Sequence, residues 1–178
     1  MSSNPVLEVL VVGVDSPHGG GRQRYGLLVG QVHSIVRIDE TESGGRLRGG
    51  PGGWELVYED GWVPLRHLRD SIGLSGSQRN PLAGQVGAAR VLGVRRSPDQ
   101  TAGPRYIGFV VDEVIEIRSL LLGEVLPFPR WVIHHLPPST VWGALHVQGE
   151  GDHALLLLLD GMALAGQVAG LRRQVERT

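Results

Sequence analysis

Apolar residues occur along the chain in short runs that end at Gly, Pro or Asp. Val and Leu dominate these runs, and glycine-rich stretches separate them. Short runs of this kind are typical of strands in a β-sandwich or a small β-barrel. The pattern therefore predicts a mostly β fold, with strands within residues 6–14, 25–38, 54–63, 90–94, 106–117, 141–147 and 153–159.

Two of these runs also predict local geometry. Asp60 and Gly61 separate the two apolar halves of residues 54–63, and an Asp-Gly pair between two such halves is a strong β-hairpin signal. In residues 25–38, apolar positions depart from strict alternation, so we expect a bulge or a bend near Gly30.

Two segments have the spacing of helices. Residues 65–74 carry apolar side chains at helical intervals and a glycine near their end, which predicts a short helix. At the C-terminus, apolar residues recur at steps of four, three and four from Leu164 to Val175. This spacing predicts a helix over residues 162–176.

Glycine-rich stretches indicate how the chain is organised. Residues 75–87 lie between two sets of predicted strands, and we expect them to connect two halves. With 178 residues, the chain has the size of one domain. We therefore expect a single domain over residues 1–178, with a first barrel at about 5–74 and a second at about 88–160. Residues 39–53 are expected to form a loop.

Two absences from the composition exclude several classes of protein. The chain contains no Cys, which excludes disulfide scaffolds, thiolate zinc sites, iron–sulfur clusters and cysteine nucleophiles. It contains no Lys, since all 17 basic residues are Arg, which excludes a P-loop and lysine Schiff-base chemistry. Both absences suit a protein that performs no covalent chemistry, and we expect no cofactor.

The charge and the apolar runs limit the surroundings in which the protein works. The formal net charge is −1, without the basic surface that nucleic-acid binding requires. The apolar start, residues 5–14, has no basic region before it, unlike a signal peptide. No apolar run approaches the ~20 residues of a membrane-spanning helix. We expect a cytoplasmic protein that inserts into no membrane and binds no nucleic acid.

Several histidines raise the possibility of a metal-dependent enzyme, as an alternative to a protein without catalytic chemistry. His134 and His135 are adjacent, and His153 follows downstream. On a strand the adjacent pair would point to opposite faces, whereas in a loop the pair could hold one metal ion with His153. A small metal-dependent enzyme on a barrel scaffold therefore stays open as an interpretation, beside the simpler one of loop histidines near Pro137.

Several segments of the chain resemble, in order, the motifs of the chemotaxis coupling protein CheW and its relatives. The likeness is best in the second half and extends through the opening strands of the first half. It is carried by VLEVLVVGVDS (6–16), RYGLLVGQVHSIVRI (24–38), GGWELVYEDGWVPLRHLRDSIGL (52–74), IGFVVDEVIEI (107–117), LPFPR (126–130), VWGALHV (141–147) and ALLLLLDGMALAG (154–166).

The resemblance implies a fold and a function. The implied fold is all-β with short helices: two packed SH3-like five-stranded barrels plus a C-terminal helix. The implied function is a non-enzymatic adaptor that couples chemoreceptors to the regulatory domain of a chemotaxis histidine kinase, at membrane receptor arrays. Two edges are implied as partner-binding surfaces, with the residues Val32, Ile35, Glu59, Asp60, Gly61, Val63 and Pro64 on one and Val111 and Val114 on the other.

Two departures from the family pattern concern charge. Either Asp60-Gly61 or Glu59-Asp60 stands where the family has an Arg-Gly turn, so the charge is inverted there, and Ser34 replaces an acidic residue. The inverted charge indicates a specialised partner, such as a chemosensory system for surface motility or pili. A divergent scaffold that does not bind the kinase is the alternative.

Overall fold

The described part of the chain consists mainly of strands. The computed structural model describes residues 5–15, 21–38, 47–50, 53–58, 61–73, 89–97, 104–127, 140–147 and 154–167. The strands are β1 (Val6–Asp15), β2 (Arg22–Leu28), β3 (Val32–Ile38), β4 (Leu47–Gly50), β5 (Gly53–Tyr58), β6 (Gly61–His67), β7 (Ala89–Arg95), β8 (Tyr106–Val111), β9 (Glu113–Leu121), β10 (Val141–Val147) and β11 (Ala154–Leu159). The helical elements are η1 (Val29–Gln31), α1 (Leu68–Ser71), η2 (Leu122–Glu124) and residues 161–167.

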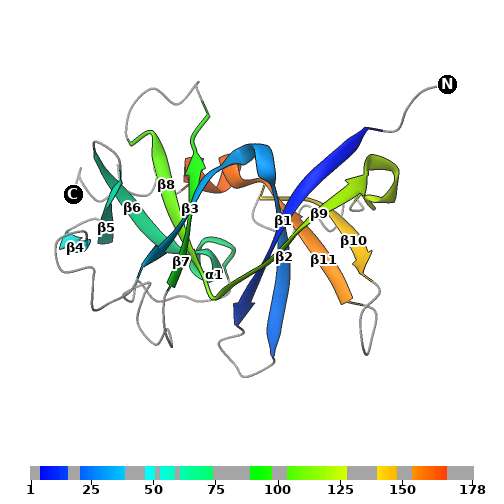
Figure 1. Ribbon diagram of the computed structural model, residues 1–178, viewed down its shortest axis with the longest axis horizontal. Helices are drawn as coiled ribbons and strands as arrows, with labels where there is room; N and C mark the ends of the chain where they lie inside the picture. The colour runs from blue at the N-terminus through cyan, green and yellow to red at the C-terminus, as the bar shows by residue number, and fades with distance from the viewer. Residues whose placement is uncertain are drawn as a thin grey trace.

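The strands form two sheets that lie side by side (Figure 1). Sheet A has the order β10-β11-β2-β1-β9, and sheet B has the order β3-β7-β8-β6-β5-β4. The predicted all-β fold of two SH3-like units is confirmed. Two details differ from the prediction: sheet B has six strands, and within the described residues neither sheet is a closed barrel. A bridge between Leu126 and Ala144 brings the segment after η2 to the β10 edge of sheet A.

The two sheets do not follow the two sequential halves that we expected. Residues 5–74 supply β1 and β2 to sheet A but β3 to β6 to sheet B. The second half is also divided, since β7 and β8 join sheet B while β9 to β11 join sheet A. The chain crosses between the sheets twice, at η1 and at Asp112. Sheet B is therefore built from the consecutive strands β3 to β8, whereas sheet A combines the strands that come before and after them.

The strand register confirms the predicted hairpin and the predicted irregularity in β3, whereas the first helix is shorter than predicted. Tyr58 pairs with Gly61 across the β5–β6 connection, which confirms the hairpin. The register of β3 shifts between Val32 and Ser34, which confirms the irregularity predicted near Gly30. The first predicted helix is shorter than expected, because the chain pairs as β6 as far as His67.

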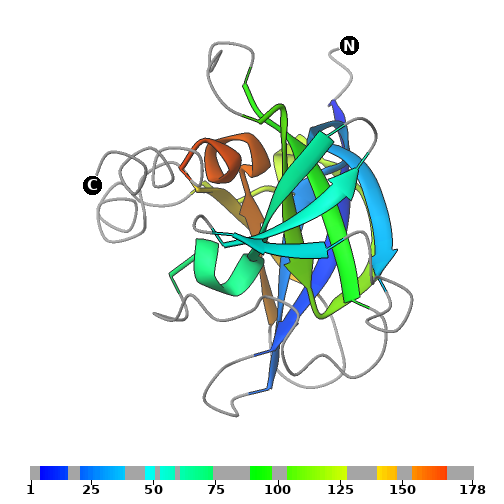
Figure 2. The same cartoon turned by 90° about the vertical axis from the view of Figure 1, so that its left-hand side faces the viewer.

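The helix at the C-terminus packs against both sheets. Residues 161–167 are helical, and the rest of the predicted helix, 168–176, lies outside the described residues. Figure 2 shows this helix on the same side of the sheet B strands as α1. Leu164 and Ala165 are fully buried in the same cluster as Leu68 of α1.

The largest apolar cluster lies between the sheets and contains side chains from both. Its members are Leu10, Val12, Val14, Tyr25, Leu27, Leu68, Leu92, Val94, Ile107, Phe109, Val111, Leu159, Leu164 and Ala165. Strand β1 also supplies Val9 and Val11 to a second cluster within sheet A. Since successive side chains of a strand point to opposite faces, β1 is buried on both faces and belongs to two cores.

Asp112 fastens the second crossing between the sheets. Its Oδ2 accepts a hydrogen bond of 2.8 Å from the Asp15 amide, and its amide donates to the Gly13 carbonyl. His67 Nε2 lies 3.4 Å from Asp112 Oδ1, and the Arg69 guanidinium lies 3.7 Å from Oδ2. Burial raises the pKa of the Asp112 carboxyl, but these hydrogen bonds and charges outweigh burial and hold it below its usual range.

We expect Asp112→Asn to destabilise the fold in a pH-dependent way. A carboxyl whose pKa is lowered by folding stabilises the protein above the unfolded-state pKa, and this contribution disappears as the pH falls. At neutral pH the loss should be about 2 kcal/mol, typical of hydrogen bonds to a charged group. Urea unfolding should show that the difference from wild type shrinks as the pH falls below about 4.

Glu116→Gln is the matched control for this measurement. Glu116 is exposed and pairs with Arg118, so its loss should change the free energy of unfolding by less than about 1 kcal/mol. A difference between Asp112→Asn and wild type that stays constant down to acid pH would contradict the assigned role of the carboxylate.

Candidate functional site

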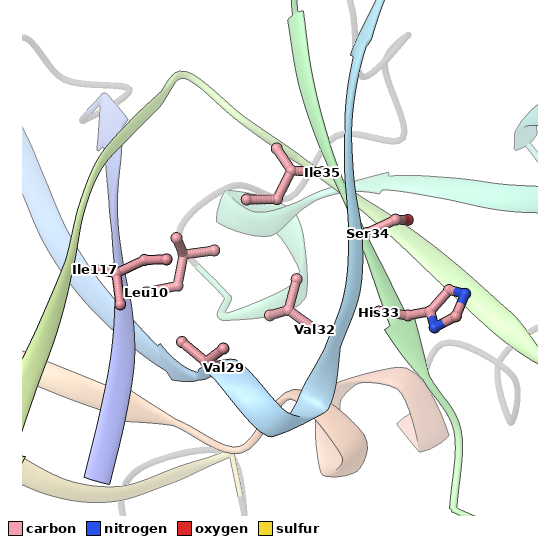
Figure 3. Close-up of a pocket in the computed structure, with 7 residues that line it drawn as sticks. All are labelled: Leu10, Val29, Val32, His33, Ser34, Ile35 and Ile117. Carbon is pink, nitrogen blue, oxygen red and sulfur yellow. The ribbon is translucent and has the colours of Figure 1, made fainter.

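An apolar groove lies at the first crossing between the two sheets (Figure 3). It encloses about 360 Å³, the size of a small binding site. Its lining comes from β1, η1, β3 and β9, with the residues Leu10, Val29, Val32, His33, Ser34, Ile35 and Ile117.

The groove follows from the strand pairing on each side. Leu10 and Ile117 are directly paired in the β1–β9 ladder, and β9 and β3 are edge strands of their sheets. Figure 3 shows Val32 and Ile35 turned toward Leu10 and Ile117 across the space. Two sheet edges therefore face each other with aliphatic side chains between them.

The rims of the groove are exposed and its floor is not. Ile35 is 46% exposed and Ile117 is 61% exposed, whereas Leu10 is only 2% exposed. Single exposed aliphatic residues are ordinary, but several gathered around a hollow are typical of a surface that another molecule covers. The groove is thus the best candidate for a functional site among the described residues.

An aromatic contact on the other face of β3 holds this wall of the groove in place. His33 and Ser34 point away from the apolar side chains in Figure 3. The His33 ring stacks on Tyr106 of β8, with centroids 4.7 Å apart, and meets Tyr58 of β5 edge-on. Stacked and edge-on pairs add stability beyond their buried area, so β3 is anchored across sheet B.

Ser34 occupies a confined position beside the groove. Its hydroxyl group is buried, and it neither donates nor accepts a hydrogen bond within the described part of the chain. It faces Gly93 of β7, where an added Cβ would lie 2.5 Å from the hydroxyl. A small side chain at 34 and a glycine at 93 therefore fit each other, and the acidic residue implied by the resemblance would be larger than Ser34.

The structure brings only some of the expected partner-binding residues to the surface. Val32 and Ile35 line the groove, and Gly61 is exposed at the start of β6. Glu59 and Asp60 lie outside the described residues.

The other four expected residues are buried or half-buried in the structure. Val63 and Pro64 are buried in β6, and Val111 is completely buried between the sheets. Val114 is half-buried and packs against the same inter-sheet core. Val111 and Val114 face the core between the two sheets, although Val114 is on β9, an edge strand of sheet A.

The sequence reasoning missed Ile117, the most exposed apolar residue of the groove. A signal was available, because Ile117 stands between Glu116 and Arg118, and an aliphatic residue between charged neighbours is a candidate for an exposed contact. Leu10 and Val29 were also missed, since only the fold brings β1 and η1 to β3.

The alternative metal site falls largely outside the described residues. His134, His135 and His153 are all in segments that the structure does not describe. Within the part of the chain that it does describe, no three His, Asp or Glu side chains are grouped to hold a metal ion.

No helix among the described residues is long and apolar enough to cross a membrane.

Comparisons with known proteins agree on one family. A family model described as the CheW-like domain matches residues 20–169. The solved structure of the scaffolding protein TtCheW from Thermoanaerobacter tengcongensis is similar over 88% of this chain and 90% of that one. The TM-score is 0.56 at 16% identity, so this likeness concerns the fold. A search of curated proteins found no match.

We expect the groove to bind an apolar fluorescent dye such as anilinonaphthalene sulfonate. Replacing both rims, Ile35→Ser with Ile117→Ser, should lower dye fluorescence severalfold, because the apolar rims are then lost. The free energy of unfolding should change little, since both side chains are exposed. Dye titration and urea unfolding of each variant measure the two effects.

Val57→Ser with Trp62→Ser is the control, because both of these side chains are also exposed and lie on sheet B away from the groove. Equal dye fluorescence in wild type and the groove variant would show that the groove is not an apolar binding site.

Proposed function

The chain belongs to the family of CheW-like domains, and from this premise we propose that it couples chemoreceptors to a chemotaxis histidine kinase. In this role it is a non-enzymatic adaptor without a cofactor. It works in the cytoplasm and reaches membrane receptor arrays through its partners. The kinase partner is the regulatory domain, and the receptor partner is a methyl-accepting chemoreceptor or a similar protein.

The apolar groove is the observation that carries this proposal. An adaptor needs no reacting groups, but it needs a rigid surface that loses water on binding. Ile35 and Ile117 provide exposed aliphatic area on two facing strands. The groove is therefore assigned to one of the two partners.

A second apolar surface supports a two-partner role. Val6 and Leu121 are paired at the far end of β1 and β9 and are 61% and 42% exposed. Leu122 is 44% exposed, and its amide donates to the Pro5 carbonyl beside them. This surface on β9 takes the place of the second edge that was expected at Val111 and Val114.

The inverted charge at Asp60 supports a specialised system. Charged residues at the rim of an interface mainly set the choice of partner and the rate of association. Asp60 in place of the family's Arg therefore favours a partner with a different charge pattern, such as a receptor of a motility or pilus chemosensory pathway.

The direct test is titration of the protein with the regulatory domain of its cognate kinase by isothermal calorimetry. We expect binding in the micromolar range. Each surface is tested by one variant, Ile35→Asp or Leu121→Asp. The variant at the kinase surface should weaken kinase binding by tenfold or more, because a buried interface charge costs over about 1.4 kcal/mol.

The other variant should keep kinase affinity and instead lose affinity for a cytoplasmic receptor fragment. Val57→Asp, at an exposed site away from both surfaces, is the control. Absence of kinase binding by folded wild-type protein at about 100 μM would contradict the coupling role and favour a scaffold that does not bind the kinase.

Asp60→Arg tests whether the charge at the turn selects the partner. The variant restores the Arg-Gly turn of the family, and we expect it to gain affinity for an ordinary chemoreceptor fragment that the wild type binds weakly. Affinity for the cognate receptor should fall at the same time, because the charge complementarity is reversed. If Asp60→Arg binds each of the two receptors with the same affinity as the wild type, the charge at residue 60 does not select the partner.

A further inference from the structure

We infer that Gln31 is a positioning residue, which clamps η1 to the start of the C-terminal helix and thereby sets the width of the apolar groove. The inference concerns the shape of the free protein. It goes beyond the proposed function, and its consequence for partner binding rests on that function.

The Gln31 side chain uses both ends of its amide across 130 residues of sequence. Its Nε2 donates a hydrogen bond of 3.1 Å to Asp160 Oδ1. Its Oε1 accepts a hydrogen bond of 2.8 Å from the amide of Gly161. Because both ends of the amide are hydrogen-bonded, the orientation of the amide plane is fixed, and so is its distance from residues 160 and 161.

Asp160 is itself held from several sides. Its Oδ1 also accepts hydrogen bonds from the amides of Met162 and Ala163, so it caps the helix over residues 161–167. Its own amide donates to the carbonyl of Thr140, which is buried. The partner of Gln31 is therefore a fixed point of the fold.

Close packing at Gly161 leaves little freedom for this contact. A Cβ at that position would lie 3.2 Å from Gln31 Oε1 and 3.2 Å from a Val94 methyl carbon. The helix that begins there buries Leu164 and Ala165 completely between the sheets. Movement of η1 away from the helix would break both hydrogen bonds and open this packing.

The clamp acts on the groove because η1 forms one of its walls. Val29 belongs to η1 and Val32 follows it directly at the start of β3, and both line the groove. Gln31 lies between them, with its side chain tied to the helix instead of the groove. The spacing between β3 and β9 therefore depends on where the clamp holds η1.

The width of the groove can be measured without any partner. The chain has no native cysteine, so spin labels can be placed across the groove at Ile35→Cys and Ile117→Cys, both exposed. Electron paramagnetic resonance then gives the distance distribution between the labels. In otherwise wild-type protein we expect a single narrow distribution.

In this labelled protein, Gln31→Met removes both hydrogen bonds while keeping the side chain's length. We expect the distribution to broaden and shift to longer distance. Gln31→Glu should broaden it further, because a second carboxylate then faces Asp160. Combining Gln31→Glu with Asp160→Asn restores a donor and an acceptor and should return the distribution toward that of wild type.

Gln23→Met is the matched control, since Gln23 is an exposed glutamine of β2 whose side-chain oxygen accepts a hydrogen bond from the Tyr25 hydroxyl, away from η1. It should leave the distribution unchanged. An unchanged distribution in folded Gln31→Met and Gln31→Glu would overturn the inference. The inference would also be overturned if Gln31→Met and Gln31→Glu unfolded while the combination of Gln31→Glu with Asp160→Asn stayed folded. The clamp would then stabilise the fold and would not set the width of the groove.

Kinase titration of the same variants separates this inference from the proposed function. A wider groove together with weaker binding would support both. A wider groove in a protein whose wild type binds no kinase would support the clamp and contradict the coupling role.

Discussion

The burial of apolar side chains between the two sheets is the constraint on which the rest of the structure depends. Sheet A joins strands that come before and after the consecutive strands of sheet B, so its two parts meet only when the chain has folded back around sheet B. Phe109 and Leu27, from different sheets, are both completely buried in this shared core. Each such side chain contributes roughly 1.5–3 kcal/mol, which makes the inter-sheet core the main link between segments far apart in sequence.

This path between the sheets also explains why the polar contacts cluster where they do. A chain that crosses between two sheets must satisfy its backbone groups at each crossing without a ladder partner. One crossing is held by Asp112 with Asp15, and the other by Gln31 with Asp160. The groove opens beside the first crossing, at η1, where the edge strands β3 and β9 face each other.

The sequence predicted the local structure well and the long-range pairing poorly. Strand positions, the β5–β6 hairpin and the irregular start of β3 depend on neighbouring residues, so periodicity and turn residues were enough. The assignment of β1 and β2 to a sheet with β11 depends on the parallel pairing of β2 with β11, for which no local signal exists. Of the candidate site, Val32 and Ile35 were found from the family pattern, whereas Ile117 required the β1–β9 register.

Burial also decides which of the apolar positions singled out by the resemblance can take part in binding. Val111 and Ile35 are both aliphatic residues on β-strands, yet one is completely buried and the other is nearly half exposed. The difference comes from their surroundings, because Val111 lies in the core between the sheets and Ile35 lies at the rim of the groove. In the proposed function, the buried positions support the fold and the exposed positions beside the groove contact the partner.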